Sequence, residues 1–376
     1  MADIVTKTHA SRADRPTSFN VDDIPVPMGR EEDWRFTPLR RIEKLFDPQG
    51  YTQRAKLEAK QSPQEVFIEK VGRDDPRVGT VLAPGDRTAV VAWEAFDQAT
   101  VITIPRGVEL ENPVIVDVRA TEELSTDHIV IRAEPLSKGT VLLRHEGPAA
   151  LNQTVEVRAE DGAQLSVIAV HEWDRDAVHA SNHRVSVGRD ASLDHLVVTL
   201  GGDLVRVCVD TEYTAPGGTL RLNGIYFVDA GQHLEHRVFV DHSEPNCYSR
   251  VVYKGALQGQ DARSVWIGDC LIGENADATD TYELNRNLIL SEGAKADSVP
   301  NLEIENGEIE GAGHASATGR FDDEQLFYLM SRGISAVDAR RLVVRGFFAE
   351  LINKIEIEEV RDHLLDAIED RLQGAH

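Results

Sequence analysis

The sequence contains little cysteine, and its cysteines show no paired spacing. Cys208, Cys247 and Cys270 are the three cysteines in 376 residues, and no two of them form a CxxC pair. An odd, sparse number in a chain of this length excludes a disulfide framework and suggests a reducing compartment. We interpret all three as small, buried, apolar residues.

Positive charge is also scarce, because 40 Lys and Arg stand against 64 Asp and Glu, giving a net charge of −24. This balance argues against a nucleic acid or an anionic membrane as partner, since both attract basic surfaces. No apolar run approaches the roughly 18 residues of a membrane span, and residues 1–7 lack the apolar segment of a signal peptide. We therefore expect a cytoplasmic protein.

The common catalytic motifs are absent, and the sequence contains no P-loop, GxSxG, HExxH or EF-hand pattern. The run from Gly311 to Ser316 begins like a dinucleotide-binding GxGxxG motif but places Ser316 where the third glycine belongs. These absences favour a protein that is not an enzyme.

A repeated strand pattern occupies the long middle of the chain. A turn containing Gly or Ala beside an acidic residue precedes an alternating apolar and polar run, as at Ala163, Ala191 and Thr219. These three positions are 28 residues apart, and the later turns keep a looser spacing. A period in the twenties built of strands and turns predicts a β-solenoid. A β-sandwich or jelly roll, with turns every 8–12 residues, is the alternative.

The two ends of the chain differ from this middle. We expect residues 1–95 to form an N-terminal cap that is helical and partly disordered, residues 96–319 the solenoid, and residues 320–376 a helical C-terminal domain. Apolar residues recur at helical spacing in two C-terminal segments. The first stripe contains Ala339, Leu342, Val343, Phe347, Leu351 and Ile352, and the second Ile357, Val360, Leu364, Ile368 and Leu372.

Two histidine-containing stretches are candidate metal sites. The run from His233 to Cys247 has suitable residue types, but His233 and His236 would face opposite sides of a strand, so we interpret it as structural. His314 lies between two small residues at the end of the repeats. Small neighbours leave an imidazole accessible, and neutral imidazole binds iron or zinc well. A structural histidine at the last repeat is the alternative.

The C-terminal third contains a specific series of runs: residues 287–291, 294–297, 300–304, 313–315, 323–334 and 346–351. Together these runs resemble the SufB/SufD family of iron–sulfur cluster assembly scaffolds. The N-terminal run 32–39, Glu-Asp-Trp-Arg-Phe-Thr-Pro-Leu, is more similar to the SufD branch of the family than to SufB. The resemblance extends over essentially the whole chain.

This resemblance implies a mainly β protein, a right-handed parallel β-helix flanked by N-terminal and C-terminal helical segments. It implies a non-catalytic subunit that pairs with SufB and docks the ATPase SufC on its C-terminal helices. His314 matches the histidine proposed to bind the cluster at the interface with SufB. The implied ATPase-docking region includes Phe327, Arg332, Gly333, Phe347 and Phe348.

The sequence departs from the family in its thiols. Many SufD sequences carry a cysteine two residues before this histidine, where this chain has Ala312, and residues 284–287 offer no counterpart of the reactive cysteine of SufB. Iron–sulfur clusters prefer thiolate ligands, so we expect a transient cluster shared with SufB and none on the isolated chain. Two other functions remain as alternatives: a β-helix enzyme acting on polysaccharide, and a self-associating solenoid. A homodimer of the isolated chain is compatible with the scaffold role.

Overall fold

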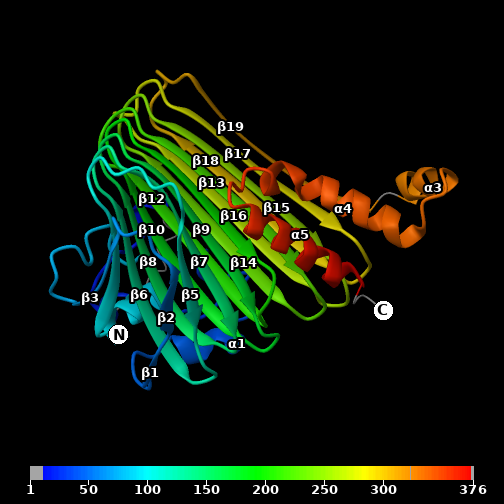
Figure 1. Ribbon diagram of the computed structural model, residues 1–376, viewed down its shortest axis with the longest axis horizontal. Coiled ribbons are helices and arrows are strands. Elements are labelled where there is room, and N and C mark those ends of the chain that lie inside the picture. The colour runs from blue at the N-terminus through cyan, green and yellow to red at the C-terminus, as the bar shows by residue number, and fades with distance from the viewer. Residues whose placement is uncertain (1–11, 322, 374–376) are drawn as a thin grey trace.

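The computed structural model describes residues 12–321 and 323–373, and its body is a solenoid of parallel strands (Figure 1). Each coil contributes one strand to each of two sheets, so that pairing joins every strand to the next but one in the chain. The solenoid makes about eight turns. All pairs between successive coils are parallel, whereas a β-sandwich is built from antiparallel sheets. The predicted parallel solenoid is therefore confirmed.

We call the two sheets sheet A and sheet B. Sheet A contains β3 (Phe67–Gly72), β4 (Gln98–Ile104), β6 (Leu124–Ala133), β8 (Ala150–Ala159), β10 (Val178–Val187), β12 (Leu204–Tyr213), β14 (His233–His242), β16 (Arg263–Ile272) and β18 (Lys295–Ile304), with β1 (Gln53–Arg54) paired to β6. Sheet B contains β2 (Lys56–Gln61), β5 (Val114–Arg119), β7 (Lys138–Gly147), β9 (Gln164–Trp173), β11 (Ser192–Thr199), β13 (Thr219–Val228), β15 (Tyr248–Leu257), β17 (Asp280–Ile289) and β19 (Gly311–Arg320).

The turns explain the repeated signature in the sequence. Gly162 and Asp190 precede neighbouring strands of sheet B and have φ angles of 68° and 52°. This left-handed conformation is favourable for glycine and tolerated by aspartate, so these residue types recur where each coil turns. Register pairs Gln164 with Ser192, 28 positions later, and Tyr248 with Asp280, 32 positions later. The looser late spacing thus reflects longer coils.

Alternate residues of each strand point into the solenoid. In β8, for example, Leu151, Val155 and Val157 belong to the interior core, which extends through all the coils. β-branched residues dominate this core because they pack well on a pleated surface. The position of this core therefore shows which side chains of each strand point inward, including those of the last coil.

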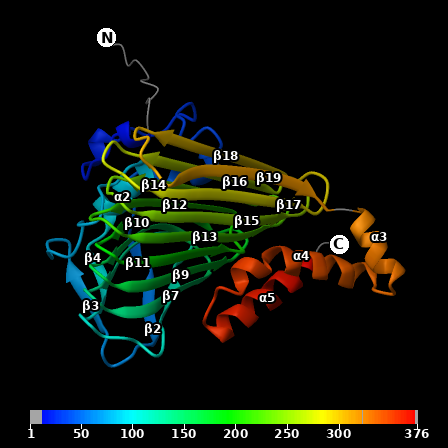
Figure 2. The same ribbon diagram turned by 90° about the horizontal axis from the view of Figure 1, so that it is seen from above.

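The C-terminal helices are α3 (Asp323–Ser331), α4 (Ala336–Ile352) and α5 (Glu358–Gln373). Helices α4 and α5 cover the outer face of sheet B, whereas α3 projects away from it (Figure 2). The second predicted stripe is confirmed, since Val360, Leu364 and Ile368 are buried. None of the helices among residues 12–321 and 323–373 is both long and apolar enough to span a bilayer.

The first predicted stripe is confirmed at its ends, since Ala339, Leu351 and Ile352 are buried, but its middle is shifted by one position. Val344 and Phe348 are buried against sheet B, whereas Leu342 is 51% exposed and Phe347 is half-buried. The sequence Leu-Val-Val followed by Phe-Phe offers two equally apolar helix faces, and contact with the sheet selects one of them.

The N-terminal segment lies on the outer face of sheet A. It contains η1 (Arg12–Asp14), η2 (Val21–Asp23), α1 (Leu39–Ile42), η3 (Glu43–Leu45) and α2 (Arg87–Ala95). Besides these helices, which were expected, the region contains three strands that were not, β1, β2 and β3. These strands are short and mostly exposed, so pairing with the solenoid, rather than burial of an apolar face, makes them strands. Part of the segment expected to be disordered is held in place, since Arg15 pairs with half-buried Asp210 at 2.7 Å; residues 1–11 lie outside the described part.

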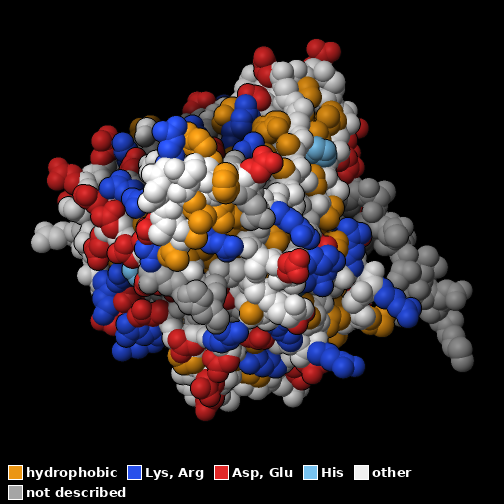
Figure 3. Space-filling model, turned by 90° about the vertical axis from the view of Figure 1, so that its right-hand side faces the viewer, with side chains coloured by type: hydrophobic (Ala, Val, Ile, Leu, Met, Phe, Trp, Pro, Cys, Tyr) orange, Lys and Arg blue, Asp and Glu red, His pale blue; other side chains and the backbone are white. Residues whose placement is uncertain are grey.

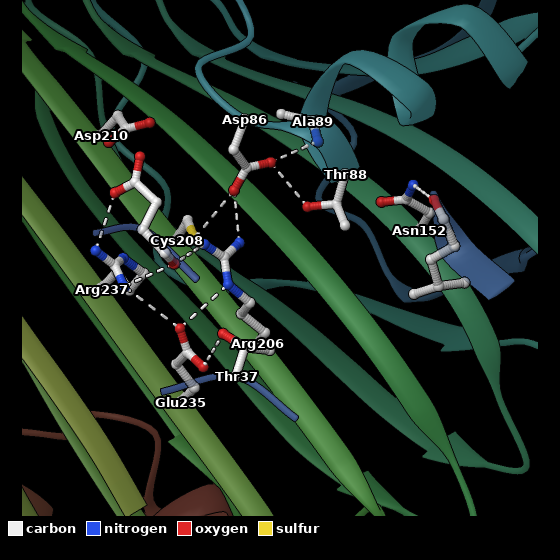
Figure 4. A network of polar contacts seen from close by, with 12 residues as sticks. Thr37, Asp86, Thr88, Ala89, Asn152, Arg206, Cys208, Asp210, Glu235 and Arg237 are labelled. Atoms are coloured by element: carbon white, nitrogen blue, oxygen red, sulfur yellow. Dashed lines mark hydrogen bonds and ion pairs between the residues drawn. The ribbon is translucent and has the colours of Figure 1, made fainter. Parts of the chain in front are cut away.

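Buried ion pairs attach this segment to sheet A (Figure 4). Arg206 of β12 contacts Asp86 at 2.5 Å and Glu235 at 3.2 Å, and its guanidinium lies 4.0 Å from the ring centroid of Trp34. Thr37 donates a hydrogen bond to Glu235 at 2.7 Å. The N-terminal segment therefore contacts sheet A through charge and hydrogen bonds, with Trp34 and Thr37 contributing from the run 32–39.

Candidate functional site at the open end

The two ends of the solenoid are finished differently. At the N-terminal end, β2 pairs antiparallel with β5, and β3 pairs antiparallel with β4. At the C-terminal end, β18 and β19 are the last strands of their sheets, and the described residues supply neither with a partner on its outer side. We call the surface formed by β18, β19 and residues 305–310 the open end.

His314 lies on β19, directly opposite Glu283 of β17 in parallel register. Thr281, Glu283 and Asn285 are buried, whereas Tyr282 is 41% exposed, so the odd-numbered positions of β17 face the interior. Residues paired in register point to the same side of a sheet, so His314 lies on the interior side of the last coil. Its side chain is exposed because no further coil covers it.

Glu283 is the unusual neighbour of His314. Its side chain is 1% exposed, and neither carboxyl oxygen has a hydrogen-bond partner among the described residues. Burial, together with the negative charge of Asp269, raises the pKa of Glu283 to about 8. The indole nitrogen of Trp266 is likewise buried without a described partner. An uncompensated buried carboxyl group is costly, which makes this position a candidate for function.

Beside this pair, the interior is held by hydrogen bonds. The Tyr226 hydroxyl donates to Asn287 Oδ1 at 2.6 Å and accepts from Asn285 Nδ2 at 2.9 Å. Asn287 in turn donates to Thr318 Oγ1 on β19 at 3.4 Å. This network links β19 to the interior and confirms that its even-numbered residues face inward.

The histidine-rich run of β14 is divided between two faces, as its spacing predicts. His233 lies beside Glu235, 3.2 Å away, on the outer side, whereas His236 contacts Thr199 in the interior at 2.9 Å. Within residues 12–321 and 323–373, no group of three or more His, Cys, Asp or Glu side chains has the arrangement of a metal site.

The three cysteines are buried, as predicted. Burial raises the pKa of both Cys208 and Cys270 to about 12, so these thiols stay protonated and are poor nucleophiles. Ala312 is partly buried against the interior core and provides no thiol near His314.

The residues expected to dock an ATPase fall into two groups. On α3, Phe327 is 74% exposed, Arg332 follows the helix and donates to the Tyr328 hydroxyl at 3.2 Å, and Gly333 has a φ of 86°. On α4, Phe347 is half-buried and Phe348 is fully buried beneath the helix. Docking by these residues stays a prediction, and only the α3 group and Phe347 present accessible side chains.

Sequence reasoning identified His314 but missed Glu283 and Trp266. The available signal was the repeat itself, because Glu283 lies 31 positions before His314, about one coil earlier. In a parallel solenoid, residues one coil apart become neighbours on adjacent strands. Without the register, however, the length of this particular coil is not known.

Together, the fold and the site define a parallel β-solenoid protein with one uncapped end, on which an exposed imidazole lies beside a buried carboxyl group. The family described as "SUF system FeS cluster assembly, SufBD core domain" matches residues 116–347. The chain therefore belongs to the SufBD family of the SUF system.

Individual relatives agree with this assignment. An "Iron-sulfur cluster assembly SufBD family protein" of Mycobacterium bovis is 49% identical over 95% of this chain and 92% of its own length. The "Iron-sulfur cluster assembly protein SufD" of Escherichia coli is 25% identical over 93% of this chain and 90% of its own length. The Bacillus subtilis protein of the same name is 29% identical over 72% of this chain and 63% of its own.

Proposed function

We propose that this protein is a non-catalytic, cytoplasmic scaffold subunit of the SUF complex. It pairs with SufB through the open end and docks the ATPase SufC on its C-terminal helices. His314 supplies one ligand to the iron–sulfur cluster that forms at the shared interface. The observation that carries the proposal is the contrast between a capped and an open end.

The open end has the properties of an interface. Solenoids need capping units with polar outer faces, and unpaired strand edges recruit further strands. The core is left partly exposed at five apolar residues: Ala294, Ala296, Leu302, Ile309 and Ala312. Ile304 at the end of β18 is 48% exposed. A second solenoid that covered this surface would complete the burial.

Of the two edge strands, β19 is better suited to strand addition. β18 contains Pro300, which lacks a backbone N–H, and prolines in sheets are confined mainly to edges. β19 has no proline and carries mainly small residues around His314. Pairing along β19 would place this imidazole inside the interface.

Helix α3 supports the proposed ATPase site. It projects from the body of the molecule (Figure 1), and Phe327, Tyr328 and Met330 are all between 46% and 74% exposed. From the side on which α3 projects, hydrophobic side chains lie among charges of both signs (Figure 3). Exposed aromatic residues with a nearby arginine are typical of the centres of protein interfaces.

Co-expression with SufB and SufC tests the proposal. Ile304→Asp should abolish the complex with SufB and Phe327→Glu should abolish SufC binding, as measured by affinity capture and molar mass. Leu136→Asp and Phe67→Glu are matched controls, because both residues are 58–65% exposed and lie away from the open end and α3. His314→Ala should lower the iron and sulfide content of an intact complex. A homodimer that persists in the presence of SufB would contradict the proposal.

A further inference from the structure

We propose that Glu283 and His314 together form an entry site for ferrous iron at the open end, completed by the subunit that covers it. This inference rests on the proposed role in cluster assembly and extends it from one ligand to a pair of unlike donors. Iron here is the cargo of the assembly reaction.

The first argument is the register. β17 and β19 are adjacent parallel strands, and Glu283 pairs directly with His314. Neighbouring strands lie about 4.8 Å apart, and paired residues project to the same side. A carboxyl group and an imidazole based at this separation can reach one ion between them.

The second argument is the change along one column of the interior. The positions stacked in register on β13, β15, β17 and β19 are Leu222, Val251, Glu283 and His314. Leu222 and Val251 are fully buried and belong to the apolar core. One coil before Leu222 the same column holds buried His195, which shares a hydrogen bond with His183 at 2.8 Å. Neither carboxyl oxygen of Glu283 has a described partner, so hydrogen bonding within the interior does not account for a glutamate there.

The third argument is that the chain leaves this carboxyl group without compensation. Both Glu283 oxygens lack a described hydrogen-bond partner, although the side chain is 1% exposed. Space for the group comes from Gly268, where an added Cβ would lie 2.9 Å from Glu283 Oε2. Buried charges are normally paired or coordinate metals. A cation at the open end would supply the missing partner.

The donor types select the cargo. One imidazole nitrogen and carboxylate oxygens suit ferrous iron, as in sites built from histidine and carboxylate, whereas an assembled cluster prefers thiolates. Two protein donors leave most coordination positions open. The pair is therefore suited to receive iron and pass it on to sulfur-bearing ligands of the partner.

The experiment titrates iron onto the complex of full-length chain, SufB and SufC. The complex is stripped with a chelator and titrated anaerobically with ferrous ammonium sulfate against a competing chelator. Glu283→Gln keeps the shape but removes the ability to ionise, and Glu283→Val installs the residue found one coil earlier. Glu111→Gln is the control, because Glu111 is an exposed carboxylate just before β5, at the opposite end of the solenoid.

We expect both Glu283 variants and His314→Ala to weaken ferrous binding by at least roughly tenfold, the lower bound for outer-shell partners of a metal. The control should bind as the wild type does. If the two residues share one ion, the double variant Glu283→Gln/His314→Ala should bind little more weakly than either single variant. If the losses of iron affinity in the two single variants added up in the double variant, the proposal that both residues bind one ion would be overturned.

The two proposals fail separately. Wild-type affinity in both Glu283 variants, with the complex intact, would overturn the iron site and leave the scaffold role in place. If Glu283→Val no longer forms the complex with SufB and SufC, Glu283 serves complex formation, and the proposed iron site is also overturned. If the wild type forms no complex with SufB, the pairing fails. The same titration of the isolated chain then supports the iron site if the Glu283 variants weaken binding, and overturns it otherwise.

Discussion

The two outer faces of the solenoid are covered by opposite ends of the chain and by different chemistry. On sheet A, the N-terminal segment is held by Arg206, which contacts Asp86 and Glu235 in a buried network. On sheet B, the C-terminal helices pack apolar residues such as Phe348 against Phe227 and its neighbours. The N-terminal segment is thus attached to its sheet mainly by charged contacts, and the C-terminal helices mainly by apolar packing.

The difference follows from the energetics of buried ions. Removing two charges from water costs about as much as their attraction returns, so an ion network adds little net stability over an apolar contact. It does, however, penalise every wrong partner, because an unmatched buried charge is expensive. We infer that sheet A selects its covering segment and that sheet B gains stability from its helices.

Lowering the pH should destabilise the interior of the solenoid before it detaches the segments that cover the two sheets. This is the largest effect that we expect. Burial lowers the pKa of both His145 and His195 to about 4, against about 6.5 when unfolded. Between pH 6.5 and 4 the unfolded chain binds protons that the folded chain cannot, so stability falls, by about 2 kcal/mol at pH 5 for each of these histidines. Urea unfolding followed by circular dichroism at pH 7.5 and 5 measures this loss.

The ion network should outlast this transition. Although burial opposes its ionisation, the charge of Arg206 lowers the pKa of Asp86 to about 2. The stability that Asp86 contributes is present above about pH 4 and is lost only as the pH falls towards 2. Proteolytic release of the N-terminal segment at pH 5 from an otherwise folded solenoid would contradict this order.

Arg206→Met should break the charged face. It leaves Asp86 and Glu235 buried without their shared cation, at a cost of about 3–5 kcal/mol in the free energy of unfolding. Arg221→Met is the matched control, because Arg221 is 42% exposed and pairs with Asp194 at 3.3 Å; its loss should cost less than about 1 kcal/mol. Equal costs in urea unfolding would show that burial of the ions is irrelevant.

Phe348→Ala should weaken the apolar face. Phe348 is fully buried, and truncation of a buried phenylalanine lowers the free energy of unfolding by roughly 3–5 kcal/mol. Because a helix that lies on a sheet can move to fill part of the cavity, we expect a cost of about 3 kcal/mol. Phe347→Ala should cost about 1 kcal/mol, because its ring is only partly buried and faces the ammonium of Lys254 at 5.6 Å. If Phe347→Ala cost more than Phe348→Ala, the helix face that contains Phe347, as predicted from the sequence, would be the one that packs on sheet B.

These two phenylalanines also show what the sequence can predict. The solenoid and its C-terminal helices follow from local periodicity, which a single chain displays directly. Which of two apolar helix faces packs depends on the sheet opposite, and so Phe347 was predicted in place of Phe348. The strands β2 and β3 were missed for the same reason, since their pairing with β5 and β4 lies outside any local window.

In the candidate site, too, one residue could be predicted from the local sequence and the other could not. His314 stands out locally, between small residues at the end of the repeats. Glu283 becomes its neighbour only through a coil of 31 residues, whereas the early repeat is 28 residues long. Nothing near Glu283 in the sequence indicates a buried, uncompensated carboxyl group.

A single ionic contact on the apolar face offers the finest test of the contrast. Lys254 of β15 donates to Glu350 of α4 at 2.7 Å and to the Phe347 carbonyl at 3.1 Å. The hydrogen bond from Lys254 helps lower the pKa of Glu350, but that carboxylate is 55% exposed, so solvent screens the pair. Glu350→Gln should therefore cost only about 0.5 kcal/mol in urea unfolding at pH 7.5, since the carbonyl still satisfies Lys254. A cost near that of Arg206→Met would mean that ions, rather than apolar burial, hold both covers in place.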